Sequence, residues 1–200
     1  MDAGLMEKIL KMEGKEIEDL AAGLDQKEIP ALVAALASKK DEERYPAFLL
    51  LRALSGIRGD LYPYWDTFME KLKSENSYQR TIGLVMLAGC AKWDADNKMD
   101  EMIGLYLSFT SDEKAVTVRQ CIQSIASILP YKRHLHGTIA EKLMSVKISG
   151  RKESQQKLVL KDILGILLQI RQYGPNERID GYIEEAHLSL DKKTAKEIFG

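Results

Sequence analysis

The chain has 200 residues, 45% of them hydrophobic, which is enough to bury the core of a folded domain or a short repeat array. Its longest uncharged apolar run is about half of the ~20 residues that a membrane span needs, and charged residues occupy the N-terminus where a secretory signal is apolar. We therefore expect a cytoplasmic protein with no membrane partner, and the net charge of −1 does not favour a protein that must neutralise many phosphates.

The N-terminal segment, residues 5–24, shows two helical sets of apolar residues separated by Gly14, which predicts two short helices or one kinked helix. Asp25 and Glu28 then have the spacing of a capping box. The helix that follows is expected to run to about Ser38, with Pro30 in its first turn, where a missing N–H costs little.

The next two helices differ in character. Asp41 is expected to cap a helix that ends at Gly56, and Pro46 inside it predicts a bend or a late start. Between Ser77 and Trp93 the apolar residues surround the helix on nearly every side. Such a helix must be covered by neighbours, so the chain is organised around it.

A repeating register links these helices to two later ones. Superposing Arg44, Arg80, Arg119 and Lys157, which are 36, 39 and 38 residues apart, aligns apolar residues at five following positions. The second position after the basic residue holds Pro46, Ile82, Cys121 and Val159, and the third holds Ala47, Gly83, Ile122 and Leu160. The sixth holds Leu50, Met86, Ile125 and Ile163, and the seventh holds Leu51, Leu87, Ala126 and Leu164. The tenth holds Leu54, Cys90, Leu129 and Leu167. All are small, apolar or proline, so one helix face recurs four times.

The residues that precede each first helix predict its start. Three positions before the basic residue stand Asp41, Ser77 and Ser154, which are good N-caps. In the third unit, Ser111 or Asp112 is expected to cap a longer helix.

A second helix follows each of these first helices. The predicted second helices are Leu61–Lys73, Lys98–Ser108, Leu135–Lys147 and Glu177–His187, and a short helix at Lys192–Phe199 would close the chain. No segment alternates with a period of two, so we predict an all-α fold of antiparallel helix pairs without a sheet. Stacked pairs share one core, which explains why the middle helices are apolar on several sides.

The unit from Glu28 to Leu54 resembles the HEAT and armadillo-like repeats. It has an I-P-x-L-V start, an Asp at the turn, an Arg three residues later and an A-x-x-L-L segment. The later units share the basic residue and the apolar register, up to Tyr173. The resemblance implies a right-handed α-solenoid in a single HEAT-like repeat domain over 1–200, with N-terminal capping helices at 1–24, about four repeat units at 25–173 and C-terminal capping helices at 174–200.

Two functions follow from this resemblance. HEAT-like arrays mostly hold another protein or a peptide, which implies a non-catalytic interaction or scaffold module with an unknown protein or peptide partner. A family of bacterial alkylpurine DNA glycosylases is also built from HEAT-like repeats, so a nucleic-acid-binding protein related to them is the alternative. Trp65-Asp66 and Trp93-Asp94 offer residue types that those enzymes use, although the spacing of Trp65 with Phe68 and Leu72 is typical of core packing.

The charge distribution suggests where an anion would bind. Between Lys114 and Lys161 the chain has ten Lys and Arg residues and two acidic residues, an excess of +8. The candidate binding patch consists of Lys132, Arg133, His134, His136, Arg151 and Lys152. Its two loops would lie at the same end of adjacent helices if the stacking is regular, and the alternative is that both loops are simply solvated.

The repeated basic residues have two interpretations as well. Arg44, Arg80, Arg119 and Lys157 would form a basic stripe on one surface, or they would pair with turn acids and loop carbonyls of the adjacent unit. The second interpretation is favoured, because Asp41 and Glu75 lie close by in the sequence.

The sequence offers little support for catalysis. Cys90 and Cys121 lie within apolar patterns without metal-ligand spacing, so we expect buried free thiols. Motifs of nucleophilic, zinc-dependent or phosphate-binding enzymes are absent from the sequence. We predict no catalytic residue, no metal and no cofactor.

Overall fold

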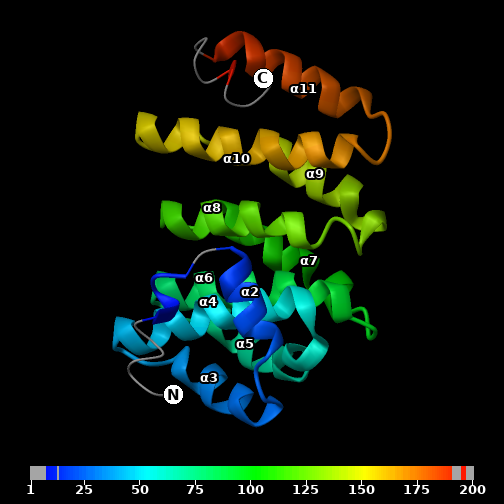
Figure 1. Cartoon of the computed structure of the whole chain (residues 1–200). Coiled ribbons are helices and arrows are strands. Elements are labelled where there is room, and N and C mark those ends of the chain that lie inside the picture. Colours follow the sequence, from blue (N-terminus) through cyan, green and yellow to red (C-terminus); the bar gives the residue numbers. More distant parts are fainter. Residues whose placement is uncertain (1–7, 13, 191–194, 197–200) are drawn as a thin grey trace. The chain divides into compact units, whose positions relative to one another are not determined.

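The computed structural model describes residues 8–12, 14–190 and 195–196. These residues form helices joined by turns and contain no strand, which confirms the predicted all-α class (Figure 1). They divide into two compact units, unit 1 (Met1–Met99) and unit 2 (Asp100–Gly200). The helix predicted at Lys192–Phe199 lies outside the described residues, apart from 195–196. The division into capping helices and repeat units stays a prediction.

Unit 1 is built around α4 and α6. Its elements are α2 (Lys15–Ala22), η1 (Gln26–Glu28), α3 (Ile29–Ala35), α4 (Asp41–Ile57), η2 (Gly59–Tyr64), α5 (Trp65–Leu72), α6 (Ser77–Cys90) and η3 (Ala91–Trp93). Helix α4 packs against α2, α3 and α6, while α5 packs along α6. Neighbours thus surround the apolar α6 helix, as its composition requires.

Unit 2 is built around α10. The helix α7 (Lys98–Ser108) begins at the unit boundary, and η4 (Phe109–Ser111), α8 (Ala115–Ser124), η5 (Ile125–Ser127), η6 (Arg133–Leu135), α9 (His136–Met144), α10 (Glu153–Arg171) and α11 (Glu177–Ser189) follow. Helix α10 packs against α8, α9 and α11. The predicted bounds of α7 are confirmed at both ends.

The N-terminal signals act as predicted. Gly14 has φ +51°, a conformation that favours glycine, and α2 begins at the next residue. Asp25 and Glu28 form the capping box: the Asp25 carboxylate accepts from the backbone N–H of Lys27 at 3.0 Å, and Glu28 accepts from the N–H of Asp25 at 3.1 Å. Pro30 lies in the first turn of α3.

The predicted caps of α4, α6 and α10 are wrong by one or two residues. Asp41 is the first residue of α4 and makes no capping bond, because it pairs with Arg44 instead. Asn76, and not Ser77, caps α6 by accepting from the N–H of Tyr78 at 2.9 Å. Helix α10 begins at Glu153, before the predicted cap Ser154.

Two further expectations about the first helices are corrected in part. Helix α4 begins before Pro46 and continues through it to Ile57, so the late start is wrong, while the alternative, a bend at Pro46, stays a prediction. Helix α8 is shorter than predicted and begins at Ala115, because Asp112 accepts from the N–H of Lys114 in the turn before the helix.

The aligned apolar register forms the core of both units. Eighteen of its twenty positions are buried, and the other two, Ala126 and Leu160, are half-buried. The register also explains a glycine on α6: a Cβ at Gly83 would lie 2.8 Å from the carbonyl oxygen of Phe68 on α5. The close packing of these two helices therefore depends on the missing side chain.

Candidate functional site

The structure separates the predicted basic patch into two parts. Lys132, Arg133, His134 and His136 lie at the N-terminal end of α9, whereas Arg151 and Lys152 follow its C-terminal end and precede α10. The nine residues of α9 place the two loops about 14 Å apart along the helix axis. The six residues therefore do not form one contiguous surface.

Lys132 and His134 share one acidic partner. The Lys132 side chain is 5% exposed, and its Nζ lies 2.7 Å from Oδ2 of Asp100 on α7. His134 contacts the other carboxylate oxygen of Asp100. Burial by itself would raise the pKa of Asp100, but the hydrogen bonds and charges of Lys132 and His134 lower it overall. The positive charge of Lys132 is thus compensated by the Asp100 carboxylate inside the protein.

Arg133 and His136 both contact the aromatic ring of Tyr173. His136 is 9% exposed, and its ring packs edge-on against the ring of Tyr173 at 4.7 Å between centroids. Arg133 is exposed, and its guanidinium carbon lies 5.0 Å from the centroid of the same Tyr173 ring. Only Arg133 of this pair is directed to solvent.

In the second loop, Arg151 is tied to the fold and Lys152 is not. Nη2 of Arg151 donates to the carbonyl oxygen of Asp112 at 3.0 Å, and the side chain is half-buried. Lys152 is exposed at the N-cap position of α10. The loop therefore contributes one solvent-facing cation from the predicted patch.

The repeated basic residues are used mainly for pairing, as expected. Nη1 of Arg44 donates to the carbonyl oxygen of Ser38 at 3.1 Å, and Nη1 of Arg80 donates to that of Ser74 at 2.9 Å. In both cases the acceptor lies six residues earlier, in the loop before the arginine's own helix, rather than in an adjacent unit. Each arginine therefore fastens its helix to the preceding loop.

The next repeat arginine makes a longer connection. Arg119 on α8 donates from Nε to Oδ2 of Asp162 on α10 at 2.7 Å, and Nη2 lies 3.3 Å from the other oxygen of the same carboxylate. This bidentate pair links two neighbouring first helices of unit 2. Lys157 forms a more exposed pair with Glu153 at 3.5 Å.

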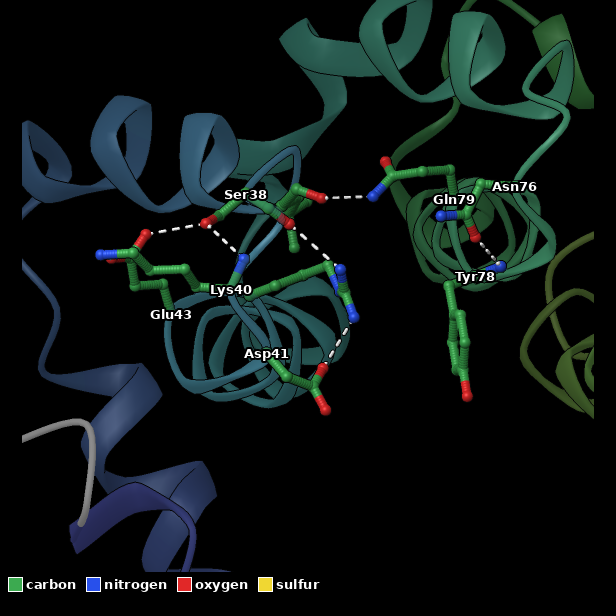
Figure 2. Close-up of polar contacts among 9 residues, drawn as sticks. Ser38, Lys40, Asp41, Glu43, Asn76, Tyr78 and Gln79 are labelled. Carbon is green, nitrogen blue, oxygen red and sulfur yellow. Dashed lines mark hydrogen bonds and ion pairs between the residues drawn. The ribbon is translucent and has the colours of Figure 1, made fainter.

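Two exposed tyrosines lie on helices that flank the contacts of Arg44: Tyr45 follows Arg44 on α4, and Tyr78 lies on α6. We call these tyrosines, together with Asp41 and the largely buried Arg44, the Tyr78 edge. Figure 2 shows hydrogen bonds along the loop before α4, whereas the Tyr78 ring points away from them. Tyr78 is 61% exposed, and the Arg44 guanidinium lies 5.5 Å from its ring centroid. This holds an accessible aromatic ring in a defined position.

A second chain of hydrogen bonds supports the same edge. Nε2 of Gln79 donates to the carbonyl oxygen of Leu36 at 2.9 Å, and Nζ of Lys71 donates to Oε1 of Gln79 at 2.6 Å. These bonds join α5 and α6 to the end of α3. Burial, followed by the positive charge of Arg44, lowers the pKa of Lys71. Hydrogen bonds of Gln79, the residue after Tyr78, therefore tie the start of α6 to the end of α3 and to α5.

Exposed apolar residues occur on the corresponding face of unit 2. Val116 on α8 is 45% exposed, and Leu158 on α10 is 43% exposed. Relative to the repeat basic residues, Tyr45 and Leu158 stand at position +1, Tyr78 at −2 and Val116 at −3. At about 100° per residue these positions share a helical sector about 100° wide. The sequence interpretation missed these residues, although large apolar residues outside the five buried positions of the register could have indicated them.

Three of the four residues in the Trp-Asp pairs considered for a glycosylase are engaged in the fold, whereas Asp66 is exposed. Trp65 is 3% exposed, which confirms its place in the core. Nε1 of Trp93 donates to the carbonyl oxygen of Ser55 at 2.7 Å. The buried carboxylate of Asp94 accepts from the hydroxyl of Tyr62 at 2.9 Å and from the backbone N–H of Lys98 at 2.9 Å. Asp94 therefore holds the start of α7.

The two cysteines are buried free thiols, as predicted. Burial, with a smaller contribution from Asp94, raises the pKa of Cys90 to about 12. Burial likewise raises the pKa of Cys121. Because the thiolate is the reactive form, neither cysteine is suited to nucleophilic chemistry.

The described part of the chain contains no group of three or more His, Cys, Asp and Glu side chains arranged to hold a metal ion. None of its helices has both the length and the apolar character needed to cross a bilayer. Comparisons of the chain with protein-family models, with curated proteins and with solved structures found no match.

Proposed function

We propose that this chain is a non-catalytic protein-interaction or scaffold module, built as a right-handed α-solenoid of HEAT-like helix pairs. The observation that carries the proposal is the exposed apolar sector of the first helices. Each unit has its own sector of this kind, with Tyr45 and Tyr78 in unit 1 and, separately, Val116 and Leu158 in unit 2. Contiguous exposed apolar surface marks sites of protein interaction, and in this proposal these residues contribute to such a surface in each unit.

The chemistry of the Tyr78 edge supports a protein partner. Tyrosine and arginine are enriched among the residues that contribute most to protein interfaces. Arg44 and the bonds beneath it hold the Tyr78 ring in place, which reduces the entropy lost when a partner binds. A partner would thus meet a surface that is already arranged.

The pairing of the cations favours a protein over a nucleic acid. Lys132 and Arg119 are each matched by a carboxylate within unit 2, and Arg151 donates to a backbone carbonyl. Affinity for nucleic acid depends on several cations that are available to phosphates. The local excess of +8 therefore overstates the positive charge that a polyanion would meet.

The proposal is tested by capture from a lysate of the organism's own cells with the immobilised chain and two variants. The variant Tyr45→Ser/Tyr78→Ser removes two aromatic rings of the exposed sector. The control Leu105→Ser removes an exposed apolar residue of α7, a second helix, where Leu105 is 48% exposed. We expect a defined set of proteins to be retained by the wild type and the control and reduced at least about tenfold on the double variant.

Two outcomes would contradict the proposal. One is equal capture by the wild type and the Tyr45→Ser/Tyr78→Ser variant. The other is a mobility shift of duplex or single-stranded DNA that persists from low to moderate salt, which would instead support the nucleic-acid-binding alternative. Circular dichroism of each variant verifies that the loss of capture is not a loss of fold.

A further inference from the structure

A second aromatic surface lies in unit 2, where three side chains from different segments meet. His136 begins α9, Tyr173 follows α10, and Arg133 begins η6. Nε2 of His136 lies 2.9 Å from the carbonyl oxygen of Leu129. Because a carbonyl only accepts, this nitrogen carries the proton. The buried imidazole is thus anchored, and the Tyr173 ring packs against it.

Arg133 lies over the Tyr173 ring and has no carboxylate partner in the part of the chain that the structure describes. Its neighbours Lys132 and His134 both contact Asp100. Among the described residues, none supplies a carboxylate to Arg133, whose guanidinium is held by the Tyr173 ring at 5.0 Å. Stacking occupies the face of the guanidinium and leaves its N–H edges available for an acceptor.

Two exposed tyrosines accompany this cation: the ring of Tyr173 lies against it, and Tyr131 is two residues earlier in the chain. Tyr131 is 48% exposed and Tyr173 is 41% exposed. We call Tyr131, Arg133 and Tyr173 the Arg133 site. Aromatic rings beside an accessible arginine are the composition found at the energetic centres of protein interfaces.

We propose that the Arg133 site binds the carboxylate of an acidic side chain in a partner protein. The planar guanidinium donates two parallel N–H bonds to the two carboxylate oxygens, and the tyrosine rings cover the aliphatic part of that side chain. This inference deepens the proposed function by naming the chemistry of the partner, and it rests on that function.

The number of available cations distinguishes a peptide from a nucleic acid. A single carboxylate needs one accessible guanidinium, whereas a nucleic acid requires contacts to several phosphates. The adjacent Lys132 is buried against Asp100, and Arg171, which precedes Tyr173 by two residues, is paired with Asp180. Lys152, the exposed cation of the second loop, lies beyond the far end of α9. One oxyanion fits this arrangement, and a chain of phosphates does not.

The test measures the fluorescence anisotropy of a labelled hexaglutamate peptide titrated with the full chain at low salt. We expect Arg133→Gln to weaken binding at least about tenfold, because it removes the charge and the bidentate bonds together. Arg133→Lys keeps the charge but cannot form two parallel bonds, so we expect a loss of several-fold. Hexaglutamine is the uncharged comparison and should not bind.

Lys152→Gln is the matched control, because it removes one exposed positive charge from the opposite end of α9. We expect it to change the affinity by less than about twofold at a salt concentration that screens distant charges. Equal losses in Arg133→Gln and Lys152→Gln would show a non-specific charge effect and overturn the inference. A single-stranded oligothymidine that binds more tightly than hexaglutamate would also overturn it.

The two proposals can fail separately. If hexaglutamate does not bind while capture still depends on Tyr45 and Tyr78, the carboxylate inference is wrong and the interaction function stands. If capture is independent of the Tyr78 edge but Arg133 binds the peptide, the assignment of the apolar sector is wrong instead. The melting temperature of every variant is compared with that of the wild type, so unfolding is recognised.

Discussion

At Gly89, the backbone of α6 lies so close to Ser55 of α4 that no side chain fits between them. A Cβ built at Gly89 would lie 2.7 Å from Cβ of Ser55. Ser55 is 4% exposed, and its hydroxyl donates to the carbonyl oxygen of Arg52, so it cannot turn away without losing that bond. The contact sets how closely the two first helices of unit 1 approach.

We therefore expect Gly89→Ala to lower the free energy of unfolding by about 1–3 kcal/mol, measured by urea denaturation. Gly56→Ala on α4 is the control, because a Cβ there meets nothing within 4 Å. Alanine favours a helix, so the control should be neutral or stabilising by up to ~1 kcal/mol. Adding Ser55→Gly should restore part of the loss, and a Gly89→Ala protein as stable as the wild type would contradict the packing.

The ionic partners of single residues could not be predicted from the sequence. The buried position of Lys132 depends on Asp100, which is 32 residues earlier in the chain and outside the basic segment. Asp162, the partner of Arg119, likewise lies just beyond that segment. Periodicity identifies which helix face is apolar, but it does not identify a long-range ionic partner. The charge excess could therefore be counted from the sequence, whereas its compensation could not.

At the scale of an element, equivalent register positions have different environments. Arg80 is 8% exposed and donates to the carbonyl oxygens of Ser74 and Glu75 at 2.9 and 2.8 Å. Lys157 holds the same register position on α10, but 52% of its side chain is exposed. The same register position thus holds a residue that binds the preceding loop in α6 and an exposed surface residue in α10.

Replacing Arg80 and Lys157 separately with methionine tests whether their side chains contribute differently to stability. Arg80→Met removes two charge-assisted hydrogen bonds to part-buried carbonyl oxygens, so we expect a loss of about 1–3 kcal/mol in urea denaturation. Lys157→Met removes an exposed ion pair and should change the stability by about 0.5 kcal/mol or less. Similar losses in the two variants would show that the loop carbonyls below Arg80 do not need its side chain.

The bounds of elements were predictable where the apolar pattern was continuous. Lys98–Ser108 agrees at both ends, and the capping box at Asp25 was recognised from two residues. The start of α6 was missed because Asn76 and Ser77 are adjacent and both are favourable caps. Propensity alone does not choose between such neighbours, since the choice depends on which side chain reaches a free N–H.

At the scale of the whole molecule, each unit has its own core from the shared register. In unit 1 Leu50, Leu54 and Leu87 are fully buried, and in unit 2 Ile122 and Ile163 are fully buried. The boundary lies in the first turn of α7. Arrays whose parts are held mainly by local contacts can lose structure in one part before another.

Leu87→Asp is expected to unfold unit 1, because it places an unpaired charge in its core at a cost of more than about 4 kcal/mol. Hydrogen exchange should show loss of protection in α4 and α6, while α8 and α10 retain theirs. The exposed-site control Leu105→Asp should leave the protection unchanged. A Leu87→Asp protein with wild-type protection in α6 would refute the register.

The placement of the two tryptophans gives unit 1 a spectroscopic label of its own. The sequence has two tryptophans, Trp65 and Trp93, and both belong to unit 1. One is buried in the core, and the other donates its indole N–H to the Ser55 carbonyl oxygen on α4. Indole fluorescence therefore follows the melting of unit 1 alone, whereas far-ultraviolet circular dichroism follows the helices of both units. The temperature interval between the two melting curves measures directly how far the halves of the chain unfold as one.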